Sequence, residues 1–160
     1  MIRYLEKQNL LILETERTSY WIGLAYPAPV CLHWGRKIAP EDADMFEPLG
    51  GHSSFDTELW RERMEYPVFD GRTFENVSLK ADVPLNLRTK GVRVQGQQAE
   101  ITLADEANVM EVCLMYRVFE DCDVVEKHAR LTANAPVKLT RMDSGACLLP
   151  HEAKPWTAHY

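Results

Sequence analysis

The chain has 160 residues, of which 46% are hydrophobic and 26% are charged, and its formal net charge is −6. This length and apolar content suffice for one domain with its own core. The negative charge disfavours nucleic acid and anionic membranes as partners. No apolar run approaches the roughly 20 residues of a membrane helix, and charge interrupts the amino terminus too early for a signal peptide. We therefore expect one cytoplasmic domain over residues 1–160, without a membrane partner.

The first part of the chain predicts short strands followed by a long loop. The strands are expected at residues 10–13, 20–25 and 30–34, with a rigid proline turn between the last two. Residues 36–73 mix prolines and glycines with acidic and aromatic residues, and 56–64 can form one or two helical turns. A long irregular loop on a β scaffold is usually functional or disordered. Its aromatic content argues against disorder.

The second part predicts an antiparallel meander. Shorter strands are expected first, at residues 75–81, 85–89 and 92–95. Residues 97–150 then alternate apolar and polar side chains, with turns at 120–123 and 134–136. Alternate side chains on a strand face opposite sides of a sheet, so one side of this meander is buried. The fold class predicted is an all-β antiparallel sandwich, with a core made of Ile101, Leu103, Val112, Leu114, Tyr116, Val118, Leu131 and Leu139.

Motifs for metals and cofactors are missing from the sequence. The histidines and cysteines lack zinc-ligand spacing, so we expect no metal. No glycine-rich phosphate loop and no nucleophile elbow is present, so we expect no cofactor. We expect His33 to be a packed strand-end residue, and the tryptophans Trp21, Trp34 and Trp60 to lie in the core or an interface. The thiols predicted to be free and buried are Cys31, Cys113, Cys122 and Cys147.

An acidic cluster marks the start of the long loop. It consists of Glu41, Asp42, Asp44 and Glu47, between two prolines. Charge runs of this kind are most often solvated surface. A second interpretation is a sugar-binding edge, because carboxylates accept hydrogen bonds from hydroxyl pairs and aromatic rings stack on sugar faces. Both interpretations remain open from these residues alone.

A series of short motifs runs in a fixed order from about Ser19 to Pro150. It begins with SYWIGLAYPAPVCLHWGRKI and FDTELWRERMEYPVFDGRTF and continues through the strand pattern Val112-x-Leu114-x-Tyr116. The series resembles the amino-terminal region of family 36 glycoside hydrolases, the microbial α-galactosidases. The resemblance implies the first part of a β-supersandwich that packs on a catalytic (β/α)8 barrel.

The resemblance also implies roles for individual residues. An aspartate and an arginine from this loop reach the active site of a neighbouring subunit in family tetramers. Asp44 matches that aspartate, and Ser53 stands where the family has the arginine. The family is retaining, and its nucleophile lies in a Lys-Trp-Asp motif of the barrel, which this sequence lacks. We thus expect this chain alone to be inactive, with no catalytic residue and with Asp44 as the candidate substrate contact.

The function predicted first is a non-catalytic accessory domain of an α-galactosidase-like enzyme. Its expected partners are the barrel, a galactoside at a shared site and further copies of the same chain. The alternative is a stand-alone β-sandwich that binds carbohydrate or protein. A weaker third possibility is a structural remnant without a function. A reading frame that continues into a barrel would favour the first of these.

Overall fold

The computed structural model describes residues 1–41, 61, 63–71 and 76–147. These residues form three antiparallel sheets, so the predicted all-β class is confirmed. The first sheet has the order β1–β2–β3–β4, with strands Ile2–Leu5, Leu10–Glu14, Thr18–Gly23 and Val30–Arg36. The second pairs β5 with β10, Leu79–Ala81 and Leu139–Met142. The third has the order β6–β7–β8–β9, with strands Leu87–Gln95, Gln98–Asp105, Met110–Phe119 and Val124–Ala133.

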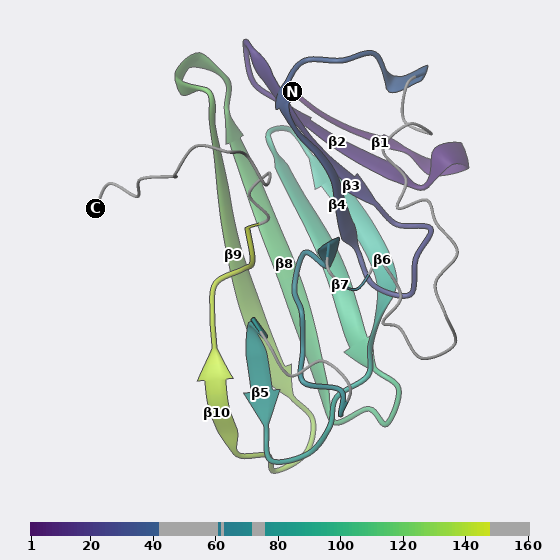
Figure 1. Cartoon of the computed structure of the whole chain (residues 1–160), viewed down its shortest axis with the longest axis vertical. Coiled ribbons are helices and arrows are strands. Elements are labelled where there is room, and N and C mark those ends of the chain that lie inside the picture. The colour runs from purple at the N-terminus through teal and green to yellow at the C-terminus, as the bar shows by residue number, and fades with distance from the viewer. Residues whose placement is uncertain (42–60, 62, 72–75, 148–160) are drawn as a thin grey trace, which may run out of the picture.

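The sheets are arranged as two layers. The long β6–β9 sheet forms one layer, and the β1–β4 sheet and the β5–β10 pair lie over its upper and lower halves (Figure 1). One apolar cluster joins all three sheets, because side chains from each of them are buried in it. Burial of this shared apolar surface is the main stabilising contribution to the sandwich.

The meander of β7, β8 and β9 follows the predicted alternation. Val112, Leu114, Tyr116 and Val118 are at most 3% exposed, while the residues between them are partly or fully exposed. The neighbouring strand contributes Ile101 and Leu103 to the same core. Leu131 is half-buried and packs against the cluster. The predicted register of this face is therefore confirmed.

Three predictions about strands need correction, and one strand was not predicted. Leu139 was expected in the core but is 37% exposed, because β10 leaves the meander and pairs with β5 as an edge strand. Residues 85–89 and 92–95 belong to one strand, β6, which continues across a bulge between Thr89 and Gly91. In the described part of the expected strand at 75–81, only β5 is a strand. Strand β1 was not predicted.

The β1–β4 sheet is apolar on both faces. Strand β2 is a nearly continuous apolar run, as expected for a strand that is covered on both sides. Leu11 and Leu13 enter the main core, whereas Leu10 and Ile12 form a second cluster with Trp21 on the outer face. Ile38 packs against this second cluster, so the first residues of the long loop cover part of the outer face.

Asp123 connects the two layers at one end of the sandwich. It follows the short turn η4 (Glu120–Cys122) and adopts a left-handed conformation with φ 52°. Its carboxylate accepts hydrogen bonds from the Thr15 hydroxyl at 2.6 Å and from the backbone and side chain of Arg17 at 2.9 and 2.6 Å. These bonds hold the β2–β3 turn against the β8–β9 turn.

Candidate functional site

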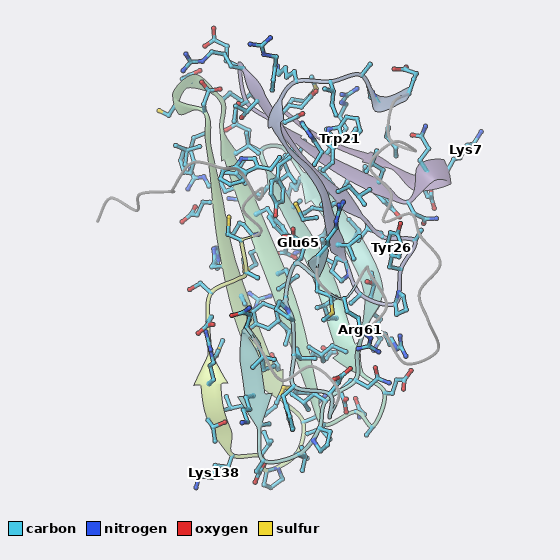
Figure 2. The ribbon with its side chains drawn as sticks, in the orientation of Figure 1. Lys7, Trp21, Tyr26, Arg61, Glu65 and Lys138 are labelled. Carbon is cyan, nitrogen blue, oxygen red and sulfur yellow. The ribbon has the colours of Figure 1, made fainter. Side chains whose placement is uncertain are left out.

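The loop predicted to contact substrate is described only at its two ends. Asp44, Asp42, Glu47 and Trp60 lie outside the described residues, as does most of the helical segment expected at 56–64. Glu41 is described, and together with Pro40 it lines a hollow of about 300 Å³ beside Lys7, Asn9 and Tyr26. Lys7 and Tyr26 both lie at the side of the molecule formed by the β1–β4 sheet (Figure 2). The first end of the loop therefore borders a polar hollow.

The second end of the loop is fixed to the sandwich by backbone and charged contacts. The Glu65 N–H donates to the carbonyl of Pro29 at 2.9 Å, and Met64 forms an antiparallel bridge with Val30. Arg61 forms an ion pair with Asp70 in which both side chains are largely buried. The residues that follow the 42–60 segment are thus attached to the sandwich.

A buried polar group lies where this second end enters the core. We call it the Glu65 cluster: the side chains of Glu65, Tyr20, Tyr116 and Lys127, with the carbonyl of Ala146. The Glu65 carboxylate accepts hydrogen bonds from the Tyr20 hydroxyl, from the Tyr116 hydroxyl at 2.9 Å and from the Lys127 ammonium at 2.9 Å. Figure 2 places Glu65 in the middle of the molecule. The cluster joins β3, β8 and β9 to two irregular segments.

The Lys127 ammonium is fully satisfied in this cluster. It donates to Glu65, to the Tyr20 hydroxyl at 3.0 Å and to the Ala146 carbonyl at 2.6 Å. An ammonium has three N–H donors, so all of them are used. Its Nζ also lies 5.0 Å from the centre of the Tyr20 ring, where the face of the ring attracts a cation. A buried charge pair with this many bonds avoids the cost of an unpaired charge.

Burial determines the protonation state of the hydroxyl and thiol groups around Glu65. Burial is the main cause that raises the pKa of Tyr20 and of Tyr116 far above the usual value, with a further contribution from the Glu65 carboxylate. For the same two reasons the pKa of the Cys31 thiol rises to about 12. The tyrosines therefore stay neutral and act as hydrogen-bond donors at any physiological pH.

The Glu65 cluster is suited to holding structure and not to catalysis. Glycoside hydrolysis needs two carboxyl groups on either side of a sugar. Glu65 is 2% exposed, and its oxygens are occupied by three donors. A substrate has no path to this carboxylate while the cluster is intact. What the cluster does is fix the end of the loop relative to the core.

The cysteines and histidines are scattered over the described part of the chain. Cys31 is buried, Cys113 is half-buried, and Cys122 and Cys147 are exposed, so the expectation of buried thiols is wrong for the last two. His33 was expected at a strand end but lies in the middle of β4, where its ring packs edge-on against Trp21 and its Nε2 is 3.0 Å from the Arg36 carbonyl. The described residues contain no group of three or more side chains placed to hold a metal ion. They also include no helix long and apolar enough to span a membrane.

The sequence profile described as "Glycosyl hydrolase family 36 N-terminal domain" matches residues 27–159. The chain belongs to the family 36 N-terminal domain family. The resemblance seen in the sequence is therefore confirmed. The comparison with curated proteins returned no match.

Solved structures of α-galactosidases have the same fold as this family 36 N-terminal domain. The galactosidase domain of the α-galactosidase–sucrose kinase AgaSK is 20% identical with a TM-score of 0.72, covering 91% of this chain and 25% of that one. AgaB from Geobacillus stearothermophilus is 20% identical with a TM-score of 0.71, covering 91% and 24%. The α-galactosidase from Lactobacillus brevis is 15% identical with a TM-score of 0.72, covering 89% and 24%. The chain thus spans about a quarter of each.

Three of the motifs that carry the sequence resemblance meet in the Glu65 cluster. Tyr20 comes from the Ser-Tyr motif, Glu65 from Glu-Tyr-Pro, and Tyr116 from the Val-x-Leu-x-Tyr strand. Sequence reasoning did not predict that these residues meet. One signal was present: alternation puts Glu126, His128 and Arg130 on the outer face of β9, which leaves Lys127 on the inner, apolar face. A lysine at such a position needs a buried acidic partner.

Proposed function

We propose that this chain is a non-catalytic accessory domain of an α-galactosidase-like glycoside hydrolase and packs on a separate catalytic barrel. The coverage of the solved α-galactosidases supports this proposal most directly. Between 89% and 91% of the chain corresponds to about a quarter of each of those proteins. The remaining length of such an enzyme is then available for the catalytic domain.

The second part of the proposal concerns the 42–60 segment as one edge of the active site. Before this segment, Ile38 packs against the outer cluster of the β1–β4 sheet, and after it, Glu65 is bound in the Glu65 cluster. Attachment of the chain on both sides of a loop lowers the entropy lost when the loop binds a ligand. Asp44 would accept hydrogen bonds from hydroxyls of a galactoside that the barrel of another subunit holds. This role requires a homo-oligomer.

The test uses the complete enzyme and compares two neighbouring carboxylates. Asp44→Ala should lower kcat/KM for a nitrophenyl α-galactoside or raise KM, since it removes a hydrogen-bond acceptor for the sugar. Asp42→Ala, from the same acidic cluster, is the matched control and should leave both constants unchanged. Equal constants for Asp44→Ala and the parent enzyme would return Asp44 to the role of a solvated loop residue. A purified preparation of this chain that hydrolysed the substrate by itself would contradict the accessory role.

A further inference from the structure

Strand β9 forms one edge of the β6–β9 sheet, and its outer backbone groups are open to pairing. It is bonded to β8 on one side, and no other strand or backbone group of the described residues bonds to its backbone. In Figure 1 it runs along one side of the molecule. An edge strand exposes a row of N–H and C=O groups that can bond to another extended chain.

The two edges of this sheet differ in how they are protected. Strand β6, at the opposite edge, is interrupted by the bulge between Thr89 and Gly91 and exposes Lys90 there. Bulges and lysines prevent edge-to-edge pairing in many proteins. Strand β9 pairs with β8 in one uninterrupted register and contains neither proline nor glycine. It is therefore the edge that is suited to pairing with a further strand.

The outer face of β9 carries both signs of charge in an order that is complementary to itself. Glu126, His128 and Arg130 share this face and are exposed. When two copies of a strand pair antiparallel around a two-fold axis, a residue before the axis lies opposite the residue equally far beyond it. With the axis at His128, Glu126 of each copy lies opposite Arg130 of the other. Opposite charges in such cross-strand pairs stabilise a sheet.

The same axis also matches side chains on the inner face. Val125 and Leu131 are half-buried and pack against the main core. The axis at His128 places Val125 of each copy opposite Leu131 of the other. Lys127 brings no free charge to this face, because Glu65 already neutralises it. Apolar side chains would therefore meet on the inner side of the strand pair.

Other registers of the same pairing are less favourable. Opposite residues of an antiparallel pair share a face, so the axis has to coincide with one residue. An axis at Glu126, Lys127 or Arg130 would place two like charges directly opposite each other, which is destabilising. An axis at Ala129 would place His128 opposite Arg130 and would leave Glu126 without a basic residue opposite it. The charges therefore select the register centred on His128.

Exposed apolar side chains lie on the same side of the molecule as this edge. Val124, at the start of β9, is 47% exposed. Strand β10 follows β9 after residues 134–138, and Figure 1 shows both strands on the same side. Its Leu139 and Met142 are 37% and 45% exposed. A chain that pairs with β9 comes close to this apolar surface, whose burial is favourable.

We propose that β9 is a homodimer interface, in which it pairs antiparallel with β9 of a second copy in the register centred on His128. The pairing joins the two four-stranded sheets into one continuous sheet. The partner is a second copy because the charge order of β9 is complementary to itself. The proposal involves neither a barrel nor a sugar, so it is independent of the accessory role. An interface centred on one strand pair supports moderate affinity, with a dissociation constant in the micromolar range.

The test is sedimentation velocity of this chain over a series of concentrations, with variants that reverse charges on β9. Glu126→Arg turns both facing pairs into pairs of arginines and should raise the dimer dissociation constant at least about tenfold. The double variant Glu126→Arg, Arg130→Glu restores opposite charges in the reverse order. Its dissociation constant should return to within about threefold of the parent value. Both residues are exposed, so circular dichroism should show the parent fold in each variant.

The matched control is Glu111→Arg, which makes the same change of net charge on the same face of β8, one strand inside the sheet. It should leave the dissociation constant unchanged. A second measurement is hydrogen exchange, in which dimer formation should slow alternate amides between residues 124 and 132. The proposal is overturned if the parent chain stays monomeric, if Glu126→Arg dimerises as the parent does, or if the double variant stays as weak as Glu126→Arg. Exchange along β9 that is independent of concentration would also overturn it.

Discussion

The β6–β9 sheet and the Glu65 cluster hold this domain together by opposite means. In the sheet, neighbouring strands are consecutive in sequence, and their buried face is apolar. The Glu65 cluster is polar, and it joins residues 19 to 107 positions apart. The sheet tolerates many apolar substitutions of suitable volume. The cluster tolerates few, because each of its members satisfies the charge or hydrogen bond of another.

The largest expected effect comes from breaking the cluster. Glu65→Ala leaves the Lys127 ammonium without its counter-charge and should lower the free energy of unfolding by about 3–5 kcal/mol. The measurement is chemical denaturation followed by circular dichroism. Glu65→Met combined with Lys127→Met removes both charges and should recover a large part of this loss. A double variant as unstable as Glu65→Ala would mean that the charge pair is not the cause.

Creating a cavity in the β6–β9 sheet should destabilise the domain by a similar or smaller amount than breaking the Glu65 cluster. Leu114 is 3% exposed in the centre of β8, so Leu114→Ala should lower the free energy of unfolding by about 2–5 kcal/mol. Leu139→Ala is the matched control, since Leu139 is 37% exposed on the edge strand β10 and should cost much less. The same denaturation experiment measures both. Equal losses for the two variants would be inconsistent with the burial difference between β8 and β10.

A third prediction concerns the edge of the β5–β10 pair. Leu139 and Met142 are 37% and 45% exposed, and edge strands with apolar side chains associate with further chains. We expect this chain to form dimers through this edge or a sheet face. The double variant Leu139→Lys, Met142→Lys should raise the dimer dissociation constant, measured by sedimentation, at least about tenfold. The lysine ammonium groups would repel each other in the dimer interface. A parent chain that stays monomeric at high concentration would count against the prediction.

The smallest expected effect is the loss of the Asp123 contacts at low pH. The hydrogen bond from Thr15, followed by those from Arg17, lowers the pKa of Asp123 from 3.8 to about 2. A folded-state pKa below the unfolded value contributes stability above about pH 4, and this contribution is lost as the pH falls through 2. Asp123→Asn keeps the left-handed turn, so its Tm should be lower than that of the parent at pH 6 and approach it near pH 2.

The matched control for that measurement is Asp121→Asn, in the turn directly before Asp123. Asp121 is exposed and forms none of the bonds that link the two turns. Its Tm difference from the parent should be small at every pH. A pH-independent difference for Asp123→Asn would show that packing of the turn, and not the carboxylate charge, causes the effect.

The alternation of apolar and polar residues correctly predicted those strands that pair with the next strand in the sequence. The alternation of Val112, Leu114, Tyr116 and Val118 determines which face is buried, because side chains on a strand alternate strictly. The same logic failed at Leu139, whose alternation is equally consistent with pairing to β9 or to β5. The choice between these partners depends on contacts across the whole chain.

Residue patterns were enough to predict an all-β domain that resembles family 36 glycoside hydrolases, and the family profile and the sheets confirm both points. Periodicity and motif order are local properties, so they can be recognised before folding is considered. The tertiary structure was needed to show that Tyr20, Glu65, Tyr116 and Lys127 share one buried site. This cluster joins residues far apart in the chain, and no local pattern specifies which distant segments come into contact.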